Sequence, residues 1–247
     1  MTSPIQKVLS TLSSRNVRCL LIGGQACIFY GGAEFSRDAD IAVLTSPDNL
    51  RRLEKALVEL QAEAIAVPPF DVEYLLRGHA VHFRCAHPDA AGMRIDVIAV
   101  MRGVDSFEVL WERRTTVEVA PGEVYEVIAL PDLVRSKKTQ RDKDWPMIRR
   151  LIEAHYAVNR QRPTPAHVEF WLLESRTPSM LREVAAAHPA ALRRASPMRP
   201  FLSAIEAVDD AALEEALEAE ERKERDADRA YWKPLREELE RLRLARS

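Results

Sequence analysis

The sequence predicts an α/β (α+β) protein in which a mixed-sheet core is followed by an all-helical C-terminal domain. Short apolar runs alternate with helix-like segments as far as residue 128, which is typical of a sheet with helices packed on it. All eight glycines lie in the first half of the chain, where tight turns are therefore expected. Six prolines fall between Pro163 and Pro200, which favours short helices with sharp ends. We place the boundary near Arg160–Thr164, so that the predicted domains are residues 1–162 and 163–247.

The composition excludes several classes of protein. Of the 247 residues, 47% are hydrophobic and 30% are charged, which is enough apolar material for a sizeable core. The net charge of -2 excludes both a uniformly basic nucleic-acid coat and a strongly acidic, solvated chain. No run approaches the roughly 18 apolar residues of a membrane helix, and the first residues do not resemble a signal peptide, so we expect no membrane partner. Cys19, Cys27 and Cys85 are too few and too widely spaced for a disulfide framework, which predicts a reducing, cytoplasmic location.

The elements expected in the first domain follow from apolar runs and turn residues. Residues 4–14 predict a helix, and the apolar run Val17–Ile22 predicts a strand because it ends at Gly23-Gly24. From Leu130 onward the pattern is helical. Between these points we expect, in order, a short helix over Gln25–Tyr30 ended by Gly31, a strand over Asp38–Leu44, a helix from Ser46-Pro47 to about Leu60, strands over Ala80–Cys85 and Met93–Val100, and a hairpin of Thr115–Val119 and Val124–Ile128 around Pro121-Gly122.

The last segment, about Asp209 to Arg246, predicts a long exposed helix. It is rich in Glu, Ala, Leu and Arg, and opposite charges recur three and four residues apart, as in Glu218 and Arg222. We expect Pro234 to break or kink this helix. A partner-binding coiled coil is the alternative, although no heptad continues through Pro234.

The tetrapeptide Arg-Asp-x-Asp occurs three times, so its context must separate the copies. Arg225–Asp228 lies in the charged terminal segment and is expected to be solvated. Arg141–Asp144 begins a helix, where Asp144 can be the N-cap. Only Arg37–Asp40 runs directly into an apolar strand, Ile41–Leu44, which makes this copy the candidate for chemistry.

The carboxylates of this copy predict a cation site. On a strand, Asp38 and Asp40 point to one face about 7 Å apart. Their repulsion grows as water is excluded, and a divalent cation such as Mg²⁺ relieves it. The alternative is a polar strand start that pairs with Arg37. The opposite face is expected to pack on the core through Ala39, Ile41 and Val43.

A third carboxylate, Asp96, lies in the middle of the apolar strand Met93–Val100. A lone carboxylate in a buried strand is costly unless it is paired or bound to a metal ion. If this strand neighbours Asp38–Leu44, the three acids suit a two-metal phosphoryl-transfer site. The alternative is that Asp96 pairs only with Arg94 or another arginine.

Two further motifs bear on the chemistry. Gly23-Gly24 follows the strand-like Leu20-Leu21-Ile22 and would let a phosphate approach the backbone, although no Walker Gly-Lys-Ser/Thr follows. A group of His and Cys residues suggests zinc, but strand alternation places its members on opposite faces, which disfavours one tetrahedral site. The members of this group are His79, His82, Cys85 and His87.

These pieces together resemble the nucleotidyltransferase superfamily related to DNA polymerase β. Its pattern is a hydrophobic residue with Gly-Gly or Gly-Ser, a carboxylate pair around one small residue, and a third carboxylate on a later strand. The stretches Gly23–Gly31 and Ser36–Ile41 look most like the AbiEii-type branch, which contains nucleotidyltransferase toxins. Leu130–Lys137 followed by Arg141–Asp144 also resembles that branch. The resemblance covers about residues 15–155.

The resemblance implies a metal-dependent nucleotidyltransferase that acts on a nucleoside triphosphate. The implied catalytic residues and ligands of Mg²⁺ or Mn²⁺ are Asp38, Asp40 and Asp96, and the implied nucleotide-binding residues are Gly23, Gly24, Arg37, Lys137, Arg141 and Asp144. Seven Lys and Arg residues between Arg135 and Arg150 fit a triphosphate, the alternative being a solvated basic helix face. The implied acceptor is a tRNA end, a protein hydroxyl or a small molecule, and the implied partner of a toxin is an antitoxin.

Two other functions are alternatives to a nucleotidyltransferase. One is a non-catalytic nucleotide-binding or RNA-binding module on the same fold, which need not keep all three acids. The other is a structural interaction protein that uses the C-terminal helix as its binding surface.

Overall fold

The computed structural model describes residues 3–33 and 35–245, which form two compact units. The sheet unit comprises the described parts of Met1–Phe29, Ala33–Ser136 and Tyr231–Ser247. The helical unit comprises Tyr30–Gly32 and Lys137–Ala230. The α+β class predicted from the sequence is confirmed, because a mixed sheet lies in one unit and helices form the other.

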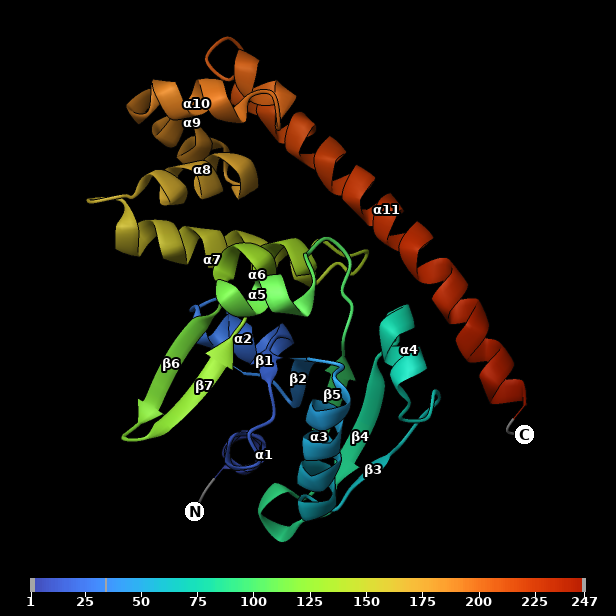
Figure 1. The fold of residues 1–247 in the computed structure, drawn as a ribbon. Helices are drawn as coiled ribbons and strands as arrows, with labels where there is room; N and C mark the ends of the chain where they lie inside the picture. Colours follow the sequence, from blue (N-terminus) through green and yellow to red (C-terminus); the bar gives the residue numbers. More distant parts are fainter. Residues whose placement is uncertain (1–2, 34, 246–247) are drawn as a thin grey trace. The chain divides into compact units, whose positions relative to one another are not determined.

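Within the described residues, the sheet has seven strands in the order β3-β4-β5-β2-β1-β7-β6. The central strand β2 is antiparallel to β1 and parallel to β5. The hairpin of β6 and β7 forms one edge of the sheet, and β3 forms the other edge (Figure 1). The strand bounds are β1 Cys19–Leu21, β2 Asp38–Val43, β3 Ala62–Ala64, β4 Val81–Cys85, β5 Arg94–Ile98, β6 Thr115–Ala120 and β7 Glu123–Val127.

In the sheet unit, the side chains of Ser3 and Asp71 cap the helices α1 and α4. Ser3 caps α1 by accepting a hydrogen bond from the Gln6 amide, and Pro4 occupies the first turn. Helices α1 and α3 contact each other and bury apolar side chains such as Leu12 and Leu53. The bounds are α1 Pro4–Ser14, α2 Gly23–Phe29, α3 Pro47–Glu59, α4 Val72–Arg77, α5 Phe107–Glu112 and α6 Leu130–Ser136, with a 3₁₀ turn over Pro88–Ala90.

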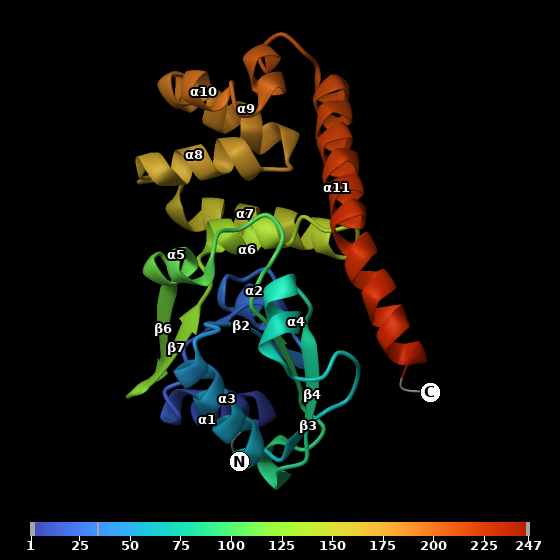
Figure 2. The same ribbon diagram turned by 45° about the vertical axis from the view of Figure 1, so that its right-hand side comes forward.

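The helical unit is a stack of short helices (Figure 2). Helix α8 contacts α7, α9 and α10, and the fully buried Trp171 lies at its centre. Prolines open α8, α9 and α10, as the Pro-rich composition predicted. The bounds are α7 Asp144–Asn159, α8 Pro165–Glu174, α9 Pro178–Ala187, α10 Pro189–Ala195, a 3₁₀ turn over Pro200–Ala204, and α11 Asp210–Leu244.

The division by packing differs from the division at Arg160–Thr164 that composition indicated. Helix α7 belongs to the helical unit, because its apolar side chains pack with α8. Helix α11 contributes its residues up to Ala230 to the helical unit and those from Tyr231 onward to the sheet unit. Composition marks where the cluster of six prolines begins, but the core of the helical unit begins earlier in the chain.

Three local expectations were wrong. Helix α11 is not broken at Pro234, which is exposed, so the carbonyl that proline leaves unpaired can be hydrated; the expected kink at this residue stays a prediction. Asp228 is not solvated: it is 2% exposed and accepts a hydrogen bond from the Gln140 amide. Asp144 is the first helical residue of α7 rather than its N-cap, and its carboxylate binds side chains of the preceding loop.

No described helix has the length and apolar character needed to cross a membrane.

Candidate active site

Strands β2 and β5 bring the three predicted carboxylates to one face of the sheet. The strands are parallel neighbours, with Asp38 opposite Arg94 and Asp40 opposite Asp96. Residues in register on adjacent strands point to the same side, and so do Asp38 and Asp40 two positions apart. The strands that carry Asp38 and Asp96 are therefore neighbours, which is the condition for a site made of all three acids.

The opposite face of β2 anchors the site in the core. Ala39, Ile41 and Val43 are each fully buried, as the alternation predicted. A shift of one residue in register would bury the acids and expose this apolar face. The cost of such a shift keeps the carboxylates on the polar face.

Arg94 lies between two of the carboxylates. Its Nη2 is 2.6 Å from Asp96 Oδ2 and 3.2 Å from Asp38 Oδ2. Asp96 therefore pairs with Arg94, as in the alternative to metal binding given for this residue. Arg94 Nε is buried and has no hydrogen-bond partner among the described residues.

His82 on β4 completes the surroundings of Asp96. It stands opposite Asp96 in the antiparallel β4–β5 pair, and its Nδ1 is 2.8 Å from Asp96 Oδ1. In the sequence, His82 stands out only as a candidate zinc ligand. The alternation of β4 could have placed it on the polar face, but its pairing with Asp96 needed the strand order.

Neighbouring charges and burial shift the pKa of Asp96 in opposite directions. Burial raises the pKa of the Asp96 carboxyl, while hydrogen bonds and charges from His82 and Arg94 lower that pKa by more, so it lies below its ordinary value. Burial lowers the pKa of Arg94, and the three carboxylates together raise it by more. Asp96 and Arg94 are therefore both charged at neutral pH.

The Gly23-Gly24 turn lies directly against Asp40. Gly23 has a φ of 64°, and a β-carbon there would lie 1.9 Å from Asp40 Oδ2. The Gly24 amide donates to the same oxygen at 3.3 Å. A side chain on Gly24 would meet Ser36 Oγ at 2.5 Å. In this structure the Gly24 amide faces a carboxylate, and its contact with a phosphate stays a prediction.

The other predicted nucleotide-binding residues are divided between the two units. Arg37 is exposed and directly precedes β2. Lys137, Arg141 and Asp144 belong to the helical unit. There Asp144, which is 2% exposed, accepts hydrogen bonds from Arg141 Nε at 2.8 Å and from Thr139 Oγ1 at 2.6 Å. Lys137 Nζ is 3.5 Å from Asp144 Oδ1, so this carboxylate organises the loop that carries both cations.

The donor set suits a hard divalent cation. Three carboxylates on one face supply the oxygen ligands that Mg²⁺ and Mn²⁺ prefer. Among residues 3–33 and 35–245, no three His, Cys, Asp or Glu side chains converge on a common metal position as they stand, and Arg94 supplies positive charge between the acids. The Arg94 side chain is 39% exposed, so its rotation toward solvent would release oxygens of Asp38 and Asp96.

Comparison with models of known protein families gives no match, and comparison with curated proteins gives none either. The functional assignment therefore depends on the residues of the site.

Proposed function

We propose that the chain is a metal-dependent nucleotidyltransferase that moves a nucleoside monophosphate from a nucleoside triphosphate to an acceptor hydroxyl and releases pyrophosphate. One observation carries the proposal. Asp40 and Asp96 stand in register on adjacent parallel strands, with Asp38 on the same face and the Gly23-Gly24 turn against Asp40. A structural ion-pair network needs neither the second carboxylate of β2 nor a glycine pair packed against it.

Each residue of the site has its own role in the proposed reaction. Asp38, Asp40 and Asp96 would hold Mg²⁺ or Mn²⁺, which when bound supplies positive charge to the reacting phosphate. Asp96 stays ionised at neutral pH, so it can accept a hydrogen bond from the acceptor hydroxyl. Arg94 offers the planar donors that suit phosphate oxygens. The absence of a side chain at Gly23 leaves Asp40 its position.

The rest of the proposal concerns substrates and partners. Lys137 and Arg141 would neutralise the triphosphate, with Asp144 holding their loop. Residues 163–247 would select the acceptor, which is a tRNA end, a protein hydroxyl or a small molecule. A toxin role with a neighbouring antitoxin and a cytoplasmic location belongs to the same proposal.

The test is incubation of the full chain with each labelled nucleoside triphosphate, Mg²⁺ or Mn²⁺, and total RNA or protein. We expect label in an acceptor together with released pyrophosphate. Asp40→Asn should abolish both, while the exposed Asp89→Asn should retain them. Binding of a triphosphate without transfer would favour the non-catalytic module instead. A chain that binds no triphosphate in the presence of either metal would overturn the proposal.

A further inference from the structure

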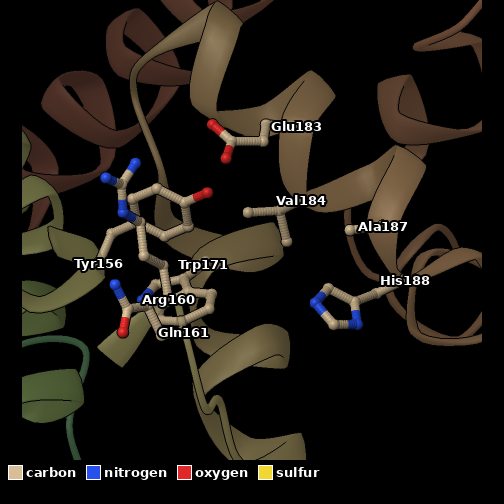
Figure 3. Close-up of a pocket in the computed structure, with 8 residues that line it drawn as sticks. All are labelled: Tyr156, Arg160, Gln161, Trp171, Glu183, Val184, Ala187 and His188. Atoms are coloured by element: carbon tan, nitrogen blue, oxygen red, sulfur yellow. The ribbon is translucent and has the colours of Figure 1, made fainter. Parts of the chain in front are cut away.

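The helical unit contains a cavity of about 310 Å³ between the end of α7, α8 and α9 (Figure 3). Its lining combines an aromatic wall with charged groups, and none of its residues belongs to the acidic face of the sheet unit. The volume is at the lower end of the range for small-molecule sites, roughly 300–1,000 Å³. A ligand about the size of an amino acid fits such a space better than a dinucleotide.

The aromatic wall is held in place before any ligand arrives. Trp171 is 1% exposed, and its indole Nε1 donates to His155 Nδ1 at 2.9 Å. The ring of Tyr156 meets Trp171 edge-on with centroids 4.9 Å apart. The buried Val184 of α9 also lines the cavity. A rigid apolar wall lowers the entropy cost of binding a flat or bulky side chain.

Two opposite charges line the same cavity. Glu183 of α9 accepts a hydrogen bond from the Tyr156 hydroxyl, and burial together with Glu183 raises the pKa of Tyr156 to about 12. Arg160 and Gln161 follow the end of α7 and line the cavity with Glu183. Within the described part of the chain, neither Arg160 nor Glu183 forms an ion pair, and both side chains are exposed, so each can contact a ligand group of opposite charge.

We propose that this cavity binds a zwitterionic α-amino acid with an aromatic or large apolar side chain. The ligand carboxylate pairs with Arg160 and the amide of Gln161, and the ligand ammonium group pairs with Glu183. The ligand side chain packs against the half-buried ring of Tyr156 and the exposed methyl group of Ala187, which Trp171 and Val184 support from behind. Among small molecules, a free amino acid combines both charges with an apolar group at this size.

The experiment is a calorimetric titration of the full chain with L-phenylalanine, L-tryptophan and L-leucine. We expect saturable binding of at least one of them. Relative to L-phenylalanine, 3-phenylpropionate lacks the ammonium group and phenethylamine lacks the carboxylate, so each should bind about tenfold more weakly or worse. These two compounds report separately on Glu183 and Arg160.

Variants identify the site. Arg160→Gln and Glu183→Gln should each weaken L-phenylalanine about tenfold, whereas Arg162→Gln and Glu169→Gln, at exposed positions outside the lining, should not. Glu183→Gln should leave 3-phenylpropionate unaffected, because that compound lacks the group Glu183 binds. Asp40→Asn should bind L-phenylalanine as the wild type does, so this result is separable from nucleotidyl transfer. Absence of binding by all three amino acids, equal binding by the cavity variants, or preferential binding of adenosine monophosphate would overturn the proposal.

Discussion

Asp40 and Asp96 are the same residue type on one face of the sheet, yet their surroundings predict opposite effects of removing the charge. Asp40 accepts from the Gly24 amide, a bond that asparagine can also accept. Asp96 binds Arg94 and His82 through both oxygens, so Asp96→Asn leaves Arg94 without its closest counter-charge. In chelator we expect Asp40→Asn to unfold with unchanged or higher free energy, and Asp96→Asn to lose about 1–3 kcal/mol.

The measurement is urea unfolding of both variants with chelator and with Mg²⁺ plus a nucleoside triphosphate. The wild type should gain stability from the metal and nucleotide, and neither variant should gain as much. If Asp40→Asn is markedly less stable than the wild type in chelator, Asp40 is a structural ion-pair partner rather than a metal ligand.

Gly23 shows how one glycine supports the site. Alanine at Gly23 meets two costs, a positive φ and a β-carbon 1.9 Å from Asp40 Oδ2. Alanine at Gly122, with a φ of 78° and no atom within 4 Å of the added carbon, meets only the first, about 1–2 kcal/mol. Urea unfolding should therefore show Gly23→Ala to be the more destabilised variant by at least about 1 kcal/mol. Equal losses would mean that Asp40 moves aside freely.

His155 should make stability depend on pH. Burial, with a smaller contribution from His167, lowers the pKa of His155 to about 4, and the Trp171 indole needs an unprotonated Nδ1 to donate to. The unfolded chain takes up this proton near the ordinary pKa of about 6.5, so the stability that His155 contributes above that pH is lost as pH falls toward 4. His155→Gln should flatten the unfolding free energy between pH 6.5 and 4. An unchanged slope would assign the pH dependence to other groups.

At the scale of elements, α11 contains a proline in its interior, where the chain makes no turn. The helix is continuous from Asp210 to Leu244 although Pro234 lacks an amide hydrogen. Proline in a helix interior is about 3 kcal/mol less favourable than alanine. Pro234→Ala should raise the free energy of unfolding by about 1–3 kcal/mol in thermal or urea unfolding. A variant no more stable than the wild type would show that local bending already compensates for the missing bond.

Elements were predictable where one local signal sufficed. The strand β2 follows from an apolar run, and α3 follows from its Ser-Pro start. Helices α4 and α5 and the strand β3 were not expected, because six or three residues carry too little periodicity.

At the scale of the whole molecule, the sequence could indicate the acids of the site but not their partners. Asp38, Asp40 and Asp96 stood out because carboxylates in apolar strands are costly. Their common face, the bridge through Arg94 and the contact with His82 depend on the strand order, which local patterns do not encode. The burial of Asp228 was missed for the same reason, since its partner Gln140 is 88 positions away.

The return of α11 to the sheet unit predicts that the end of the chain stabilises α4. His79 is 1% exposed, and its Nε2 donates to Glu238 Oε2 at 2.7 Å. Arg77 Nη1 is 2.6 Å from Glu238 Oε1, and Leu235 is buried on the same stretch of α11. A chain that ends at Ala230 would leave His79 without this carboxylate and uncover apolar surface beside α4.

Amide hydrogen exchange measures this effect element by element. In the chain ending at Ala230, we expect protection to fall in α4 and β4 and to stay unchanged in the β6–β7 hairpin at the other edge of the sheet. Glu238→Gln keeps the helix and the Leu235 contact, so it should lower protection in α4 by less than the truncation does. Unchanged protection of α4 in both variants would mean that α4 and His79 are held by the sheet alone. An equal loss of amide protection in α4 and in the β6–β7 hairpin would instead mean that the truncation destabilises the whole sheet unit. The end of α11 would then stabilise that unit globally rather than α4 locally.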